Sequence, residues 1–225
     1  MNENGKQIAA KKALEYIHDG MILGIGSGST VKYFIEFIAD KIKRGEFRDL
    51  KAIPSSYDTR MQLHKYGIEC IDLLDYPYPD VTIDGADSVY LDKGILIKGG
   101  GGAFLREKII GYAAKDFIII VDESKINRYH AVPVEVIPFG LGFVINKLRS
   151  ISEGIRIREC TGKLSPCISD NGNIIVDVNF SEEVINKDLE AKLNMIPGVL
   201  ENGIFSRNAE IIVGKRNGDV EIFKI

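Results

Sequence analysis

The chain has 225 residues, of which 45% are hydrophobic and 27% are charged, and this balance is typical of a folded rather than a disordered protein. Its formal net charge is −3 and its basic residues are dispersed, which argues against nucleic acid as a partner. The longest apolar runs are too short to span a membrane, and residues 1–12 show no secretory signal, so membrane-spanning and secreted classes are not indicated.

The first 125 residues alternate between the periodicities of helices and strands. Helices are predicted over residues 3–19, from 31 to near 45, 57–66 and 103–114, and strands over residues 21–25, 51–53, 81–83, 94–97 and 117–121. Because strands that alternate with helices form parallel sheets, we expect a mostly parallel sheet as the core of an α/β fold.

The pattern changes near residue 131. Beyond an extended stretch at 132–138, helices are predicted over 140–150 and 186–194, strands over 155–158, 174–178, 198–205, 210–213 and 220–225, and Asn-Gly hairpin turns at 171–172 and 217–218. This pattern indicates a small α+β domain over residues 132–205. The last two strands are expected to return to the edge of the first domain, which then comprises residues 1–131 and 206–225.

Three scattered cysteines, Cys70, Cys160 and Cys167, include no C-x-x-C pair. Such a set indicates structural thiols in a reducing compartment. A catalytic cysteine is disfavoured, because no histidine lies in a comparable motif.

The first motif that can carry chemistry is the glycine-rich turn at residues 24–30, which joins a predicted strand to a predicted helix. It is not a Walker loop, because Gly-Lys-Ser/Thr is absent, and Ser29 stands where a dinucleotide fingerprint has its third glycine. Two interpretations stay open. The N–H groups and hydroxyls of the turn bind a phosphate at the helix N-terminus, or Ser29 or Thr30 simply caps the helix.

The second motif is Asp84-Gly85-Ala86-Asp87, which follows the strand predicted over 81–83. Open α/β sheets bind their ligands at the carboxyl ends of strands, where these carboxylates are expected to lie. They act on substrate hydroxyl protons, hold a divalent metal, or merely form an Asx turn. A lysine rather than a histidine is their nearest candidate partner.

The third motif is a run of four glycines at residues 99–102, with Lys98 before it and Glu107 after it. Four glycines fit no strand or helix interior, so they indicate a sharp turn or a close approach to a ligand. Taken alone, Glu107 is more readily interpreted as an exposed helix residue, and the glycines beside it favour a functional role. Lys125, after the strand at 117–121, adds positive charge, and we expect the strand ends near 25, 83, 97 and 121 to share one sheet edge.

The order and spacing of these motifs resemble the ribose-5-phosphate isomerase, type A, family over nearly the whole chain. The resemblance rests on residues 26–30, 84–87, 98–102 with 106–108, 122–125, 134–138, 170–173 and 196–199. It implies a Rossmann-like domain with a smaller α+β domain, in cytoplasmic homo-oligomers, dimers or tetramers, of the non-oxidative pentose phosphate pathway. The implied reaction interconverts ribose 5-phosphate and ribulose 5-phosphate without a metal or cofactor.

The resemblance also implies roles for individual residues. Glu107 falls on the position of the catalytic base, and Asp84 and Lys98 are expected to assist it. The implied substrate-binding positions are Ser27, Gly28, Ser29, Thr30, Asp84, Gly85, Ala86, Asp87, Lys98, Gly99, Gly100, Gly101 and Lys125. Two features depart from the family pattern, namely Ser27 in place of threonine and a short loop between Lys125 and Val132.

Two other classes of function remain as alternatives. A sugar-phosphate deaminase or lactonase of a related fold is expected to use a histidine, and His18, His64 and His130 all lie outside the motifs. A non-catalytic sugar-phosphate sensor is expected to carry a DNA-binding segment, for which the chain leaves no room.

Overall fold

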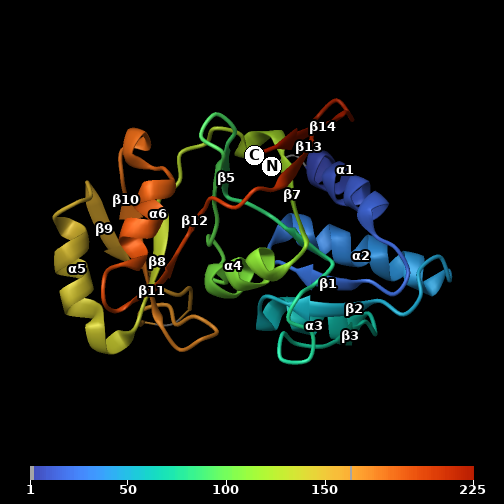
Figure 1. Ribbon diagram of the computed structural model, residues 1–225, viewed down its shortest axis with the longest axis horizontal. Helices are drawn as coiled ribbons and strands as arrows, with labels where there is room; N and C mark the ends of the chain where they lie inside the picture. Colours follow the sequence, from blue (N-terminus) through green and yellow to red (C-terminus); the bar gives the residue numbers. More distant parts are fainter. Residues whose placement is uncertain (1–2, 163) are drawn as a thin grey trace. The chain divides into compact units, whose positions relative to one another are not determined.

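The computed structural model describes residues 3–162 and 164–225, which form two compact units (Figure 1). Unit 1 contains the described residues as far as Ala86, together with Arg106–Ile126 and Arg207–Ile225. Unit 2 contains Asp87–Leu105 and Asn127–Ser206. The units differ from the expected domains chiefly in residues 87–105, which belong to unit 2. Whether either unit folds as an independent domain stays a prediction.

Unit 1 is built on a seven-stranded sheet with the order β14-β13-β7-β4-β1-β2-β3. All neighbouring strands are parallel except the β13–β14 hairpin at the sheet edge, so the predicted mostly parallel α/β fold and the terminal hairpin are confirmed. The strands are β1 (Ile22–Ile25), β2 (Lys51–Pro54), β3 (Glu69–Cys70), β4 (Val81–Asp84), β7 (Asp116–Asp122), β13 (Glu210–Gly214) and β14 (Val220–Lys224). The helices are α1 (Glu3–Ala13), α2 (Ser29–Lys43), α3 (Tyr57–Lys65) and α4 (Phe104–Ala113), the last of which joins unit 1 from residue 106.

The two faces of this sheet are covered by different helices. α1 and α2 lie side by side, and their apolar residues share a core with Ile83, Ile118 and Ile120 (Figure 1). Because strand side chains alternate between faces, Thr82 points the other way, and its hydroxyl donates to the Ile110 carbonyl of α4 at 3.2 Å. α4 therefore packs on the face opposite α1 and α2.

Unit 2 contains two antiparallel sheets. The larger has the order β11-β8-β10-β9 and packs with two helices around an apolar core, as expected of an α+β unit. Its elements are β8 (Val132–Val136), α5 (Leu141–Arg149), β9 (Gly154–Ile157), β10 (Ile174–Asn179), α6 (Lys187–Asn194) and β11 (Val199–Asn202). The smaller sheet has the order β12-β6-β5 and comprises β5 (Ser88–Tyr90), β6 (Ile95–Ile97) and β12 (Ile204–Phe205).

The strand ending at residue 97 is where the sequence prediction is wrong. β6 does not join the parallel sheet; it pairs antiparallel with β5 and β12 in unit 2. A short, fully buried apolar run is compatible with either setting, because its residues carry no alternation that distinguishes them. The shared edge of the parallel sheet therefore collects the strand ends at β1, β4 and β7, and not that of β6.

The remaining differences are local. The first helix ends as a 3-10 turn at Leu14–Tyr16, and the strand expected over 198–205 is divided at Gly203 into β11 and β12. A Cβ atom at Gly203 would lie 2.3 Å from the Lys98 carbonyl oxygen, so close backbone packing accounts for the division. The turn at 171–172 is confirmed, with Gly172 at φ 82° and its N–H bonded to Ser169.

One surface carboxylate provides a stability prediction for unit 1. Asp80 accepts a hydrogen bond from the Ile22 N–H at 2.9 Å and one from the Lys115 ammonium at 2.6 Å. Both interactions, the backbone bond first, lower the pKa of the Asp80 carboxyl. A lowered folded-state pKa stabilises the fold above the unfolded-state value, and that stability is lost as pH falls through the folded-state pKa.

We expect Asp80→Asn to reduce the free energy of unfolding by about 1 kcal/mol at neutral pH, and by less in acid. Urea denaturation at several pH values measures both. The exposed Asp75→Asn in the same connection is the matched control and should change little. An Asp80→Asn deficit that stays constant from neutral to acid pH would contradict the assignment.

Candidate active site

The candidate site in unit 1 lies where β1, β4 and β7 end. These strands are neighbours in the sheet, in the order β7-β4-β1, and they are parallel, so their carboxyl ends lie at one edge. The Gly26 N–H, just beyond β1, donates to the Ile83 carbonyl of β4 at 2.9 Å. This bond continues the strand pairing into the glycine-rich turn and fixes the start of the loop against β4.

Ser27 joins two carboxylates at this edge. Its hydroxyl donates to Glu107 Oε1 at 2.5 Å, and its backbone N–H donates to Asp84 Oδ1 at 3.2 Å. Both carboxylates are buried, with 3% of Glu107 and 0% of Asp84 exposed. Three segments far apart in the sequence thus bring together one hydroxyl and two acids, and the exposed-helix interpretation of Glu107 is wrong.

Gly26 makes this close approach possible. A Cβ atom there would lie 1.8 Å from Asp84 Oδ1 and 2.0 Å from its Cγ, so any side chain would displace the carboxylate. Asp84 Oδ1 also accepts the Gly85 N–H at 2.7 Å, and the Gly26 carbonyl accepts the Thr59 hydroxyl at 2.7 Å. The backbone of the turn therefore holds Asp84 in one orientation.

The turn ends at the N-terminus of α2, and neither of the two predicted capping residues is the N-cap. Gly28 is the N-cap, with φ 98° and no side-chain capping bond, and Ser29 and Thr30 already belong to the helix. Their hydroxyls accordingly lie in the first turn, where backbone N–H groups lack intrahelical acceptors and the helix dipole favours an anion. This arrangement suits the phosphate interpretation better than the capping one.

Lys6 is a candidate site residue that sequence analysis missed. This lysine of α1 is buried, and its ammonium donates to Ser29 Oγ at 2.8 Å. It therefore adds a positive charge to the first turn of α2, beside the hydroxyl. In the sequence Lys6 is an ordinary charged residue of an amphipathic helix, and no local pattern relates it to a loop 23 positions away.

Lys125 follows β7, on the one-turn 3-10 helix Glu123–Lys125. The turn is fixed by the buried Asp122, which accepts bonds from both the N–H and the hydroxyl of Ser124. Because β7 is the neighbour of β4, Lys125 lies at the same edge of the sheet as Asp84.

Unit 2 brings a second group of predicted residues together. Asp87 Oδ2 accepts the Gly100 N–H at 2.7 Å, which joins the second acid of the Asp-Gly-Ala-Asp motif to the glycine run. Lys98 is buried, its N–H donates to the Gly203 carbonyl at 2.9 Å, and its ammonium lies 5.5 Å from the centre of the Phe205 ring. Gly99 has φ 102°, which only glycine adopts without strain.

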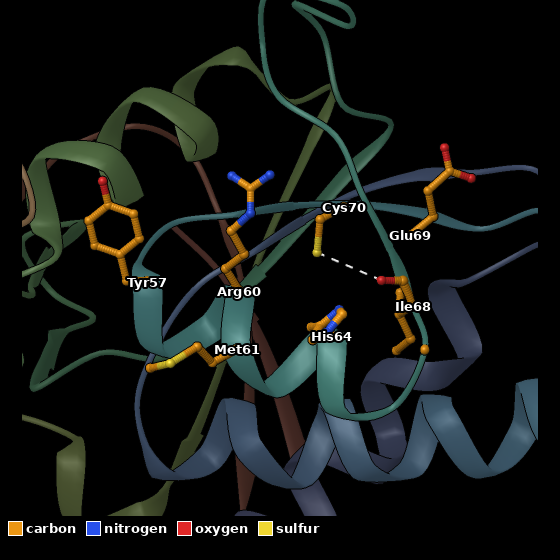
Figure 2. Close-up of a pocket in the computed structure, with 8 residues that line it drawn as sticks. Tyr57, Arg60, Met61, His64, Ile68, Glu69 and Cys70 are labelled. Atoms are coloured by element: carbon orange, nitrogen blue, oxygen red, sulfur yellow. Dashed lines mark hydrogen bonds between the residues drawn. The ribbon is translucent and has the colours of Figure 1, made fainter.

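The predicted residues thus form two groups joined by the chain itself. Ala86 ends the stretch of unit 1 that carries Asp84, and Asp87 begins unit 2. A cavity of about 780 Å³ lies beside α3 and β3, and none of the predicted site residues lines it (Figure 2). It is lined by Tyr57, Arg60, Met61, His64, Gly67, Ile68, Glu69 and Cys70.

A parallel α/β sheet with buried acids and a cationic helix N-terminus at its carboxyl edge defines a class of enzymes that act on small anionic substrates. The comparisons with known proteins make the class specific. Residues 51–218 match the family model described as ribose 5-phosphate isomerase A (phosphoriboisomerase A). The chain belongs to this family.

Individual relatives cover almost the whole chain. It is 47% identical over 211 residues to ribose-5-phosphate isomerase A of Archaeoglobus fulgidus, with 92% of each chain covered. The solved structure of ribose 5-phosphate isomerase A from Methanocaldococcus jannaschii matches with a TM-score of 0.95 and 38% identity, and 100% of each chain is covered. A solved D-ribose-5-phosphate isomerase in complex with phospho-erythronic acid matches with a TM-score of 0.94 and 41% identity, covering 98% of this chain and 97% of that one.

Proposed function

We propose that the protein interconverts D-ribose 5-phosphate and D-ribulose 5-phosphate through an enediolate, without a metal ion. The observation that carries the proposal is the buried Glu107 carboxylate, held by the Ser27 hydroxyl at 2.5 Å beside the N–H that orients Asp84. The relatives named as ribose-5-phosphate isomerases support it, as does the sugar-acid phosphate bound to one of them.

Moving a carbonyl from C1 to C2 requires a base that takes the C2 proton and returns it to C1. Glu107 is that base, because one carboxylate can serve both carbons when water is excluded from it. Asp84 handles the hydroxyl protons, both in opening the sugar ring and between the two oxygens of the enediolate. Its bonds to the Ser27 and Gly85 N–H groups hold it as an acceptor.

The enediolate and the phosphate need positive partners. Lys98 and the N–H groups of Gly99 and Gly101 stabilise the enediolate oxygen, as donors fixed before the charge develops, and the Gly100 N–H holds Asp87 in place. The turn before α2 and the first residues of α2, together Ser27 to Thr30, bind the phosphate with Lys6 and Lys125. Gly85, Ala86 and Asp87 complete the substrate contacts.

We also propose the setting in which the enzyme acts. It belongs to the non-oxidative pentose phosphate pathway, works in the cytoplasm and forms a homodimer or homotetramer. Light scattering during size-exclusion chromatography measures the oligomeric state, and a monomer at micromolar concentration would contradict that part. Among the described residues, no helix is both long enough and apolar enough to cross a bilayer.

The deciding experiment is turnover of ribose 5-phosphate in D₂O with EDTA present. We expect ketose formation with deuterium entering C1, since the proton passes through an exchangeable carboxyl. Retained activity in EDTA supports the metal-independent mechanism. Binding of the sugar phosphate without turnover or exchange would instead favour a sensor.

Lys6→Met is expected to raise KM for ribose 5-phosphate by about 10- to 100-fold, because one charge-assisted hydrogen bond to the phosphate is lost. The effect on kcat should be smaller. The phosphate is remote from the reacting carbons, so its binding energy is used in both the ground state and the transition state. Steady-state kinetics measure the split. Lys11→Met, at an exposed position of the same helix, is the matched control, and an equal KM for both variants would remove Lys6 from the site.

A further inference from the structure

The tetraglycine loop is held from one side by an arginine that no site motif contains. Arg158 Nη1 donates to the Gly99 carbonyl at 2.7 Å and to the Gly100 carbonyl at 3.3 Å. Arg158 follows β9, and all of these residues belong to unit 2. One guanidinium nitrogen therefore fixes two successive peptide groups of the glycine run.

The guanidinium is itself fixed by a carboxylate. Arg158 Nε donates to Asp177 Oδ2 at 3.1 Å, and Nη2 donates to Asp177 Oδ1, so the pair is bidentate. The side chains are only 14% and 11% exposed. Bidentate arginine–carboxylate pairs fix the orientation of the two side chains as well as adding energy. Asp177 lies in β10, which pairs with β8 on one side and with β9 on the other. Arg158 and Asp177 thus form a clamp on the glycine loop, and Asp177 anchors this clamp to an internal strand of the sheet.

The geometry of the peptide bond shows what this clamp does to the loop. In a trans peptide the C=O and the following N–H point in opposite directions. Since the Gly99 carbonyl faces Arg158, the Gly100 N–H faces away from it, and there it meets Asp87 Oδ2 at 2.7 Å. By the same reasoning the Gly101 N–H also points away from Arg158. On the side opposite the arginine, the loop therefore presents the Gly101 N–H, next to the Gly100 N–H that Asp87 already accepts.

We propose that Arg158 is a positioning residue for the isomerase reaction, which holds the Gly99 and Gly100 carbonyls so that the loop donors are preset for the enediolate oxygen. This inference rests on the proposed function. Four glycines lose more backbone entropy on ordering than any other residues, so without the clamp the donors must be ordered during the reaction itself. That cost appears in the transition state and lowers kcat.

We expect Arg158→Met to lower kcat for ribose 5-phosphate by about 10- to 100-fold, in the range found when oxyanion donors are misplaced, with KM changed by less than about threefold. Affinity for phospho-erythronic acid, whose carboxylate stands in for the enediolate oxygens, should fall in parallel with kcat. Arg158→Lys should recover only part of kcat, because an ammonium cannot keep the bidentate pair while reaching the loop.

Arg156→Met is the matched control. Arg156 also approaches Asp177, at 3.6 Å, but its side chain is 80% exposed, so this variant removes the same charge without touching the loop. Asp177→Asn keeps the shape of the site while weakening the pair, and it should lower kcat in the same direction, by less, even if Arg158→Met unfolds. Wild-type turnover is measured first. No turnover overturns the proposed function, whereas an active wild type with Arg158 and Asp177 variants equal to Arg156→Met in kcat overturns the positioning role.

A second, independent observation concerns two thiols. Cys160 Sγ and Cys167 Sγ lie 2.9 Å apart, seven positions apart in the sequence. The segment is closed by the Glu159–Pro166 bridge, and the Cys167 N–H donates to the Arg158 carbonyl at 2.7 Å. A disulfide has sulfurs about 2.05 Å apart, so a small movement brings these free thiols to bonding distance.

We infer that Cys160 and Cys167 form a dithiol that a peroxide oxidises reversibly. One thiolate attacks a peroxide oxygen, which gives a sulfenic acid and one water after protonation. The second thiol attacks that sulfur, the S–S bond forms, and a second water leaves. Two sulfurs are oxidised by one equivalent of hydrogen peroxide, and a thiol such as dithiothreitol reverses the change.

The test is hydrogen peroxide at one equivalent, followed by thiol titration and intact mass. Titratable thiols should fall from the three free cysteines to one, with a loss of two hydrogens and no covalent dimer, and dithiothreitol should restore them. Cys70→Ser should leave the reaction unchanged, and Cys160→Ser should abolish it. A gain of oxygen without loss of a second thiol, or a disulfide between chains, would overturn the inference.

Discussion

Glu107→Gln is expected to lower kcat for ribose 5-phosphate by about 10²- to 10⁴-fold, the usual contribution of a general base, with little change in KM. Glutamine keeps the volume and an oxygen that accepts the Ser27 hydroxyl, so the 2.5 Å contact and the burial at 3% exposure are compatible with the variant. Only the basicity is removed. Ketose formation under steady-state conditions measures both constants.

Two further variants make this result interpretable. Glu36→Gln, on the exposed face of α2, removes a carboxylate elsewhere and should leave kcat and KM unchanged. Ser27→Ala retains the base but removes the donor that orients it, so we expect a loss of about tenfold. Turnover by Glu107→Gln close to that of Glu36→Gln would show that another group carries the proton.

Sequence predicted most strands of the parallel sheet, because several independent signals agreed at those elements. At β1 and α2, a buried apolar run, a glycine turn and a helical spacing all follow one another within residues 21–42. β3 and β5 were not predicted, since they have two and three residues and depend on a neighbouring strand for their existence. β6 was assigned to the wrong sheet for the same reason.

The residues of the candidate site likewise divide into those that a local sequence signal predicted and those that it did not. Asp84 and the turn around Ser27 follow strands of the parallel sheet, so local sequence placed them at its edge. Glu107 was singled out by the glycine run that precedes it, but its role as the base came from the family resemblance, because nothing in its own helix predicts that it is buried. Lys6 and Arg158 were missed, since each contacts its loop through a pairing of distant segments that leaves no local pattern.

Gly26→Ala is expected to have the second large effect. It tests whether the glycine-rich turn keeps Asp84 in its observed orientation. The added methyl would lie 1.8 Å from Asp84 Oδ1 and 2.6 Å from its Cβ. Neither the turn nor Asp84 can move easily, since the Gly26 N–H is bound to the Ile83 carbonyl of β4 at 2.9 Å and Asp84 is completely buried. We expect a loss of about 1–3 kcal/mol in the free energy of unfolding, typical of overpacking.

The same substitution should lower kcat by at least about 100-fold, because a displacement near 1 Å is enough to misplace a catalytic group. Urea denaturation and kinetics on the folded fraction separate the two effects. Gly142→Ala, on an exposed position of α5 with nothing within 4 Å of the new methyl, is the matched control. It should stabilise the helix by about 0.5–1 kcal/mol and leave kcat unchanged. If Gly26→Ala loses stability but retains wild-type kcat, Asp84 does not need its observed orientation, and its role in moving the hydroxyl protons is wrong.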